Sequence, residues 1–383
     1  TAAAGLKGKR AAVLTGGRVT TEDAYGYAKF ARIALGTNDI DYRARVTSDE
    51  ERDFLAAHVA GSATTYRDID TADHVALIAF EPEEESPIVF LRINKQFKKR
   101  GLKVTAIATK QSIAMDKLKA EFIKVAPGAE SAAVSALSLT PKSIILVGER
   151  ASESAGLFSA VASLAAKTGA KVAYIPRRAG ERGALEAGAI GNLLPGGRPV
   201  TDAAARVDLA SAWSVASMPS NIGRSTKEII SAVNAGDINA LVVGGVDPLD
   251  GDNIQATLAA LDKAFVVSLE IAPSAVTERA NVVLPVAAVT EKSGSFLNWE
   301  GRARAFDAAV AESLNRSDVR ILSALADAMG ESIMLGTVSA TAREIAQLGK
   351  WDGARAPFTS IAAASAQKVS GNEAIITSWR RLL

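Results

Sequence analysis

The sequence predicts an α/β fold in which helices cover both faces of parallel sheets. Short apolar runs rich in β-branched residues recur along the 383 residues and show no polar alternation, which is typical of strands buried on both faces. Alanine-rich segments with a helical period separate these runs. This alternation of strand and helix predicts doubly wound parallel sheets, and the length is sufficient for two or three domains with hydrophobic cores.

The individual elements follow from the two patterns in chain order. The predicted strands are the apolar runs at residues 11–15, 75–80, 104–107, 143–147, 172–175, 240–243, 265–269 and 282–284. The predicted helices, with an apolar period near 3.6, are at residues 22–35, 88–99, 153–167, 226–234, 254–261 and 318–329. Thr20 precedes Glu22 and Asp23, which indicates a helix start, because carboxylates are favoured at the positive end of the helix dipole. Pro87 suits the first turn of its helix.

Composition excludes several kinds of site. The chain contains no cysteine, so it can supply no thiolate for an iron–sulfur cluster or zinc, no disulfide and no cysteine nucleophile. Its two histidines, His58 and His74, have no metal-binding spacing, and we expect both to be incidental. The net charge of +2 gives no electrostatic reason to expect nucleic acid as a partner. No uncharged apolar run is long enough to suggest a membrane span.

Gly16 and Gly17 lie between the first predicted strand and helix, where backbone N–H groups could bind a phosphate. The turn lacks a G-x-G-x-x-G pattern, and Glu22 and Asp23 in the next helix would repel an anion. We therefore interpret the two glycines as a tight turn. The chain also lacks the G-x-x-x-x-G-K-[ST] phosphate loop and the G-x-S-x-G nucleophile motif.

Carboxylates gather after two of the predicted strands. Magnesium or calcium could bind there, because hard cations take several oxygen ligands. The EF-hand spacing is absent, and solvated loops at the strand ends are the simpler interpretation. The two groups are Glu81, Glu83, Glu84 and Glu85, and Asp247, Asp250 and Asp252.

Two further clusters combine charge with aromatic or proline residues. Residues 298–302, Asn-Trp-Glu-Gly-Arg, predict a loop that packs one aromatic ring and pairs Glu300 with Arg302. A group of arginines could bind a phosphate or an acidic partner face, or could simply carry surface charge. That group is Arg177, Arg178, Arg182 and Arg198.

Three segments together resemble the molybdopterin oxidoreductase family, which includes formate dehydrogenases and periplasmic nitrate reductases. The family's Lys-Phe-Ala-Arg…Gly-Thr-Asn-x-x-Asp segment is similar to AYGYAKFARIALGTNDIDYRARV in this chain. The family's strand followed by an Asn-Pro turn is similar to DIDTADHVALIAFEPEEESPIV. ANVVLPVAAVTEKSGSFLNWEGRARAF resembles the most specific family signature. The residues that match it are Leu284, Pro285, Glu291, Gly294, Phe296, Asn298, Glu300, Gly301 and Arg302.

Within this family, PRRAGERGALEAGAIGNLLPGGRPV and the ending IITSWRRLL resemble the branch found in the large peripheral-arm subunit of respiratory NADH:quinone oxidoreductase (complex I). The chain starts at Thr1 without Met, so we expect it to be a piece of a longer protein. The resemblance implies iron–sulfur clusters in an N-terminal portion of the parent, upstream of Thr1, and no cofactor in this piece.

The chain departs from the catalytic members of the family at two positions. They place a Cys or selenocysteine metal ligand just after the Arg-Val of RARV, where this chain has Val46-Thr47-Ser48. Ser48 is the alternative ligand, one or two positions away. The family's cofactor-contacting Asn before Pro is Glu81 here. Both departures argue against bound molybdenum and pterin.

The resemblance implies two α/β domains of the formate dehydrogenase type, one inserted in the other. The first would use residues 1–40 and 140–335, the second residues 41–139, and residues 336–383 would form a helix and a linker. The strand at 11–15 should then share a sheet with 143–147, and those at 75–80 and 104–107 should lie in another. Trp299 should be at least half buried where the domains meet. The cleft inherited from the family should be water-filled or plugged by side chains, with candidate lining residues Gly16, Gly17, Glu81, Gly244, Asp247, Asn298 and Arg302.

The function implied is a non-catalytic scaffold region, with no catalytic or metal-binding residues, in a complex that transfers electrons from NADH to quinone. Its expected partners are other peripheral-arm subunits, at the cytoplasmic side of the bacterial inner membrane and without membrane insertion. The alternatives are a molybdopterin-dependent oxidoreductase, such as a formate dehydrogenase alpha subunit whose metal is held by the pterin alone, and a divergent dinucleotide-binding module.

Overall fold

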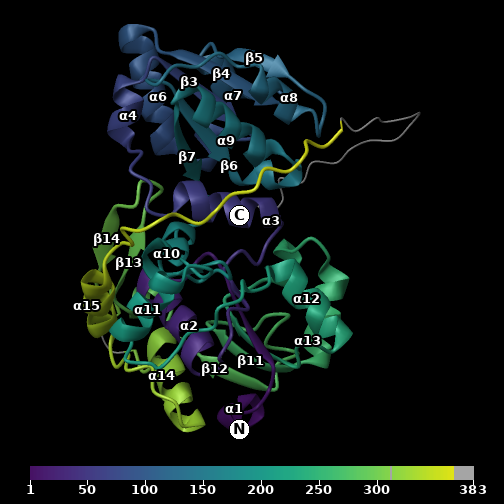
Figure 1. Ribbon diagram of the computed structural model, residues 1–383, viewed down its shortest axis with the longest axis vertical. Coiled ribbons are helices and arrows are strands. Elements are labelled where there is room, and N and C mark those ends of the chain that lie inside the picture. The colour runs from purple at the N-terminus through teal and green to yellow at the C-terminus, as the bar shows by residue number, and fades with distance from the viewer. Residues whose placement is uncertain (311–312, 366–383) are drawn as a thin grey trace. The chain divides into compact units, whose positions relative to one another are not determined.

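The computed structural model describes residues 1–310 and 313–365. The chain divides into two compact units, and the second is inserted into the sequence of the first (Figure 1). The first unit comprises Thr1–Thr47 and Arg178–Pro357, and the second comprises Ser48–Arg177 with the described residues from Phe358 onward. Each unit contains its own five-stranded parallel sheet.

The sheet of the first unit has the strand order β12-β11-β10-β1-β2. Every neighbouring pair is parallel, so the carboxyl ends of all five strands meet at one edge. The order reverses between β1 and β10, because the chain goes first to β2 on one side and later to β10 on the other. The strands are β1 (Ala11–Thr15), β2 (Ile40–Asp41), β10 (Ala240–Gly244), β11 (Phe265–Glu270) and β12 (Val282–Pro285).

Helices cover both faces of this sheet. On one face, apolar residues of α12 and α13 pack with Leu14, Leu241 and Val243 in a continuous buried core. On the other face lie α2 and α14, which contact each other (Figure 1). The helices of the unit are α1 (Ala2–Leu6), α2 (Thr21–Ile33), α10 (Glu181–Glu186), α11 (Ala203–Ala212), α12 (Thr226–Ala235), α13 (Ile254–Lys263), α14 (Asp318–Met329) and α15 (Val338–Leu348).

The sheet of the second unit has the order β5-β4-β3-β6-β7, and it reverses between β3 and β6. Helices α4 and α6 contact each other on one face, and α8 and α9 do so on the other (Figure 1). The strands are β3 (His74–Ile78), β4 (Lys103–Ala108), β5 (Glu121–Lys124), β6 (Ile144–Gly148) and β7 (Lys171–Ile175). The helices are α3 (Asp49–Phe54), α4 (Tyr66–Thr71), α5 (Pro82–Glu85), α6 (Pro87–Arg100), α7 (Ile113–Lys117), α8 (Glu130–Ser135) and α9 (Leu157–Thr168), with a π-helical turn at Leu55–Val59.

The doubly wound fold class predicted from the sequence is confirmed, and so are the helix starts that carry a capping signal. The N–H of Asp23 donates to Thr20 Oγ1 at 3.2 Å at the start of α2. Pro87 occupies the first turn of α6. Each predicted strand coincides with an observed strand to within two residues at either end. The patterns missed the short elements, among them α1, α10, α11 and the edge strand β5.

The predicted assignment of strands to sheets is wrong at one point. Strand β6 pairs with β3, with Ile78 opposite Val147, and not with β1. The inserted unit therefore runs from Ser48 to Arg177 and includes β6 and β7, instead of spanning residues 41–139. The physical reason is that β4 and β5 occupy only one side of β3, so its other edge needs a partner, and β6 satisfies those backbone groups.

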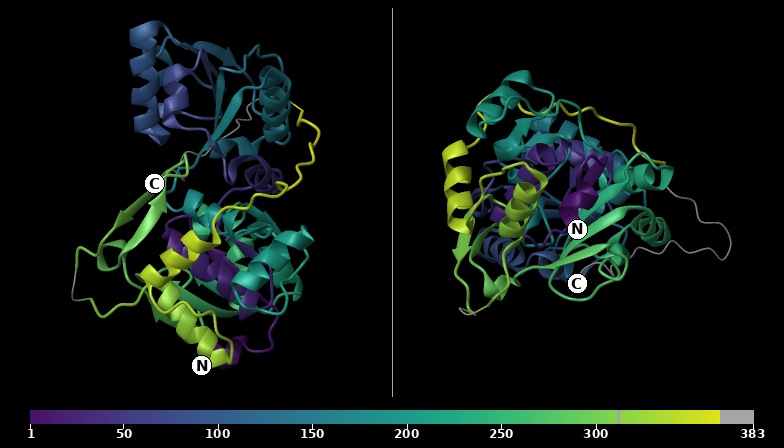
Figure 2. Two further views of the ribbon diagram at one scale, coloured as in Figure 1. Left: turned by 60° about the vertical axis from the view of Figure 1, so that its left-hand side comes forward. Right: turned by 90° about the horizontal axis from the view of Figure 1, so that it is seen from below.

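A separate antiparallel hairpin projects from the first unit, formed by β13 (Gly294–Leu297) and β14 (Ala303–Phe306) (Figure 2). It carries the 298–302 cluster at its turn. Trp299 is only 5% exposed, as expected, although its location where the two domains meet stays a prediction. The short antiparallel pair β8 (Leu193–Leu194) and β9 (Arg198–Pro199) completes the unit.

The segment predicted as a helix and linker at residues 336–383 contains α15 and, in its described part, no further helix or strand up to residue 365. Residues 366–383 lie outside the described residues. No helix in the described part of the chain is both long and apolar enough to span a membrane.

Candidate functional site

The carboxyl edge of the first sheet, where the strand order reverses, brings together four of the seven predicted cleft residues. In doubly wound sheets, ligands bind at this position, beyond the strand ends. Gly16 and Gly17 follow β1, Gly244 ends β10, and Asp247 comes shortly after it. The N–H of Gly16 donates to the carbonyl of Gly244 at 2.9 Å, which holds the two strand ends against each other.

Close packing explains why glycines stand here. A Cβ atom at Gly16 would lie 2.0 Å from the carbonyl oxygen of Gly245, and one at Gly244 would lie 1.9 Å from the Tyr27 hydroxyl. A Cβ atom at Gly17 would lie 2.7 Å from the side chain of Glu181. The glycines therefore allow close approach of the protein's own atoms, which agrees with the tight turn inferred from the sequence.

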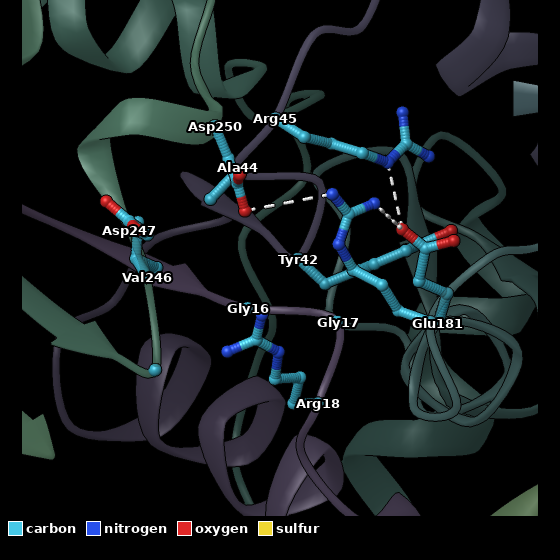
Figure 3. A pocket seen from close by; sticks show the side chains of 12 residues that line it. Gly16, Gly17, Arg18, Tyr42, Ala44, Arg45, Glu181, Val246, Asp247 and Asp250 are labelled. Carbon is cyan, nitrogen blue, oxygen red and sulfur yellow. Dashed lines mark hydrogen bonds and ion pairs between the residues drawn. The ribbon is translucent and has the colours of Figure 1, made fainter. Parts of the chain in front are cut away.

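Ion pairs occupy the space in front of this turn (Figure 3). Arg45 Nε lies 2.9 Å from Glu181 Oε1, and the two side chains are 3% and 2% exposed. The guanidinium group of Arg178 lies 3.5 Å from the same Glu181 carboxylate and 3.7 Å from the carboxylate of Asp250. It therefore links the two acidic side chains. Asp247 accepts the N–H of Leu249 at 2.9 Å and so caps a short 3-10 turn.

The cavity that remains has a volume of about 20 Å³. It is lined by Gly16, Gly17, Arg18, Tyr42, Ala44, Arg45, Arg178, Glu181, Gly245, Val246, Asp247 and Asp250. This volume is close to the minimum that one water molecule needs. A pyrophosphate or a pterin does not fit there unless the Arg45–Glu181–Arg178–Asp250 ion pairs separate.

Asn298 and Arg302 line neither this pocket nor the cavity described below for the second unit. They close the turn of the β13–β14 hairpin, where the N–H of Arg302 donates to Asn298 Oδ1 at 2.9 Å. Arg302 Nε also pairs with Glu300 at 3.0 Å, as the sequence predicted. Their contacts in the described structure are those of a hairpin turn.

Glu81, the remaining candidate, belongs to the second unit. It precedes α5 after β3 and is 4% exposed. Its carboxylate accepts the N–H of Glu84 at 2.8 Å and the hydroxyl of Ser112 at 2.6 Å. It lines a cavity of about 630 Å³ at the carboxyl ends of β3, β4 and β6. The polypeptide reaches Glu81 through Ala79, whose φ of +48° is a left-handed conformation that costs energy for a residue with a Cβ atom.

The positions next to the family's metal-ligand site have local structural roles. Arg43 is fully buried and donates to Thr47 Oγ1 at 2.7 Å and to both carboxylate oxygens of Asp41. Ser48 Oγ accepts the N–H of Glu51 at 3.1 Å and caps α3. The described residues contain no group of three or more acidic, His or Cys side chains arranged to hold a metal. His58 packs between Phe54 and Phe358, and His74 Nε2 lies 2.8 Å from Thr105 Oγ1.

The arginine cluster is neither a surface patch nor a gathered anion site. Arg182 donates to the carbonyl of Trp299 at 2.7 Å, and Arg198 pairs with Asp208 at 2.6 Å. Arg177 pairs with Glu149 at 3.6 Å within the second unit. These arginines bind the chain's own carbonyls and carboxylates, because their guanidinium groups are largely buried and need partners.

Sequence reasoning missed two of the four residues that fill the first site. Arg45 and Glu181 are 136 positions apart, and no local pattern links them. It also missed Lys292, shortly before β13, which bridges Asp23 at 2.6 Å and Asp318 at 3.0 Å. The only available signal was the position of Glu22 and Asp23 in the first turn of a helix, which we interpreted as dipole complementation alone.

Comparisons with known proteins agree with this architecture. The family model described as molybdopterin oxidoreductase matches residues 4–328. The chain is 50% identical, over 98% of its length and 48% of the relative's, to the G subunit of the NADH-quinone oxidoreductase of Mycobacterium bovis. It is 47% identical to the corresponding subunit from Streptomyces coelicolor, over 98% of the chain and 49% of that relative. The chain thus spans about half the length of the curated relatives it matches.

A solved structure shares the fold at low sequence identity. The formyltransferase/hydrolase complex from Methylorubrum extorquens contains a chain that aligns with a TM-score of 0.54 and 14% identity, over 86% of this chain and 94% of that one. This likeness concerns the fold alone, whereas the family model covers most of the sequence. On that match and on the identity to the two curated relatives, the chain belongs to the molybdopterin oxidoreductase family.

Proposed function

We propose that this chain is a non-catalytic scaffold region of the large peripheral-arm subunit of NADH:quinone oxidoreductase. The similarity to curated subunits of that complex supports the assignment. The observation that carries the non-catalytic role is the ion-pair network of Arg45, Glu181, Arg178 and Asp250 at the reversal point of the first sheet. It occupies the position where a doubly wound sheet would bind a ligand.

The residues present do not fit the molybdenum–pterin group that the family implies. The first site offers about 20 Å³. At the second sheet, the carboxylate of Glu81 stands at the family's Asn position. A phosphate about 4 Å from a carboxylate would be disfavoured by roughly 4 kcal/mol at an effective dielectric of 20. The whole chain also has no cysteine to bind the metal or an iron–sulfur cluster. No reaction step therefore runs through these side chains in the proposed role.

In this proposal the chain acts through its surfaces. It supports the cluster-binding portion of the parent and contacts other peripheral-arm subunits, on the cytoplasmic side of the membrane. Each unit's helix-covered sheet and buried ion pairs would supply rigidity, and electron transfer would belong to clusters held elsewhere in the complex.

Elemental and pterin analysis tests the absence of the cofactor. The chain is purified from a host that makes the molybdenum cofactor, beside a cofactor-containing family member from the same host as positive control. We expect less than stoichiometric molybdenum, tungsten and oxidised-pterin fluorescence from this chain, and full signals from the control. Stoichiometric metal or pterin would overturn the proposal and favour a molybdopterin-dependent oxidoreductase.

An assembly experiment tests the scaffold role. Arg45→Met should weaken the fold of this region, because it removes the partner of the buried Glu181. In a strain whose parent subunit carries this substitution, the amount of assembled complex and its NADH:quinone activity should fall together. The activity per assembled complex should stay unchanged. A loss of activity in fully assembled complexes would contradict a scaffold role.

A further inference from the structure

The second unit contains a cavity that the proposed scaffold role does not use. Its volume is about 630 Å³, within the range of small-molecule sites in proteins. Its walls come from the carboxyl ends of β3, β4 and β6 and from α7 and α9. Ile107, Met115 and Leu157 give it an apolar lining, and each of the three is at most 3% exposed.

The lining residues carry a net negative charge, and of the five glutamates Glu83 is paired with Lys117, which lies outside the lining. Five glutamates face one lysine and one arginine among the lining residues. Arg150 is already paired with Glu85 at 2.8 Å, and Lys110 lies exposed at the rim. The glutamates are Glu81, Glu83, Glu84, Glu130 and Glu153.

Glu81 is the carboxylate that points to a ligand. It is 4% exposed, and its two hydrogen bonds come from neutral donors, the Ser112 hydroxyl and the Glu84 N–H. No lysine or arginine in the described part of the chain pairs with it. A buried carboxylate without a cation is costly, and here it lines a cavity large enough for the missing cation and an organic group.

Three backbone donors at or next to the cavity lining are already used. The N–H of Met115 donates to Ser112 Oγ, and those of Gly156 and Ser159 donate to Glu50 at 2.8 and 2.7 Å. The described residues also form no cluster of three metal-ligating side chains. The excess of carboxylates in the lining disfavours an anion, and the lack of such a cluster gives no support for a metal ion.

We propose that this cavity binds a small organic cation, an aliphatic primary amine whose ammonium group pairs with Glu81. The aliphatic part would contact Ile107, Met115 and Leu157. An ammonium group has three donors and no acceptor, and a carboxylate that lines the cavity and already accepts two hydrogen bonds can still accept more. The proposal does not depend on the scaffold role, because it concerns the second unit alone.

Methyl NMR of the full 383-residue chain labelled at methionine tests this proposal. The chain has four methionines; Met115 lines the cavity, whereas Met218, Met329 and Met334 belong to the first unit. The probes are n-hexylamine, 1-hexanol and hexanoate at constant pH and ionic strength. Hexylamine should shift the Met115 signal saturably, with a Kd on the order of 1 mM, and leave the other signals unchanged. Hexanol should bind at least about tenfold more weakly, and hexanoate should not bind.

Variants locate the charge. Glu81→Gln should weaken hexylamine binding by at least about tenfold, because a hydrogen bond between charged groups is replaced by one to a neutral group. Glu331→Gln, an exposed position in the first unit, is the matched control and should bind hexylamine as the natural chain does. Comparing hexylamine with hexanol in the natural chain tests the role of the Glu81 charge without any substitution. The proposal can therefore still be tested if the Glu81→Gln protein does not fold. Equal binding of hexylamine and hexanol, an unshifted Met115 signal, or unchanged binding in a folded Glu81→Gln protein would each overturn the proposal.

Discussion

Replacement of Lys292 by Met should destabilise the first unit strongly, and by an amount that depends on pH. Lys292 Nζ lies 2.6 Å from Asp23 Oδ2 and 3.0 Å from Asp318 Oδ2, and the lysine side chain is 11% exposed. Asp318 also accepts the hydroxyl of Tyr27 at 2.9 Å, and Asp23 accepts the N–H of Val319. One ammonium group thus joins α2, the segment before β13 and the first turn of α14.

The magnitude follows from these distances. Each ion pair corresponds to an attraction of roughly 6 kcal/mol at an effective dielectric of 20, which is offset by the cost of removing the charges from water. Methionine keeps most of the volume but leaves two buried carboxylates without a cation. Removal of one partner of a buried pair costs about 3–5 kcal/mol, and we expect a loss in this range at pH 8.

The pH dependence has a defined sign. Burial, and then the neighbouring charge of Asp23, raise the pKa of Asp318 to about 6 in the folded chain. The stabilisation from protonating this carboxyl is therefore fully present below its unfolded pKa and is lost as the pH rises through about 6. Without Lys292 the pKa rises further, so the penalty of Lys292→Met should be about 1–2 kcal/mol smaller at pH 5.5 than at pH 8.

Urea unfolding at the two pH values measures both quantities. Lys227→Met, at an exposed position in the same unit, is the control and should change the free energy of unfolding by less than about 0.5 kcal/mol. The double replacement Lys292→Met with Asp318→Asn should recover part of the loss at pH 8, because one buried charge is removed. A loss below about 1 kcal/mol, or a loss that is equal at pH 5.5 and pH 8, would refute the electrostatic account.

Three further predictions concern packing and burial. Gly16→Ala should lower the free energy of unfolding by at least about 2 kcal/mol, because its Cβ would lie 2.0 Å from a backbone oxygen. In the control variant Gly336→Ala, the new Cβ meets nothing within 4 Å, so the free energy of unfolding should hardly change. Equal thermal midpoints for the two variants would contradict this prediction. Arg45→Met should cost about 3 kcal/mol in urea unfolding, since it removes the 2.9 Å partner of the buried Glu181, and an unchanged urea midpoint would show that the pair contributes little. Trp299, at 5% exposed, should emit at short wavelength and resist iodide quenching, so Trp299→Phe should remove part of the unquenched fluorescence and leave the part that comes from Trp213, which is 4% exposed. Loss of quenchable fluorescence instead would mean that the Trp299 ring is in water.

Local patterns were sufficient for the fold class and for most elements. Apolar runs such as 11–15 and 240–243 are strands because buried parallel strands require continuous hydrophobicity. Thr20 and Pro87 mark helix starts because capping depends on neighbours within three residues. Family resemblance added the inserted arrangement, which local patterns do not contain.

The sequence by itself determined the alternation of strand and helix, the absence of thiol chemistry and the family. Tertiary structure decided which strands share a sheet and which charges meet. Strands β1 and β3 are both five residues long and buried throughout, so nothing local indicates that β6 pairs with β3. Arg45 finds Glu181 across 136 positions, and Lys292 finds Asp23 across 269. Such pairs form only after the chain has folded, because their attraction depends on burial at a short distance, and sequence separation carries no information about either quantity.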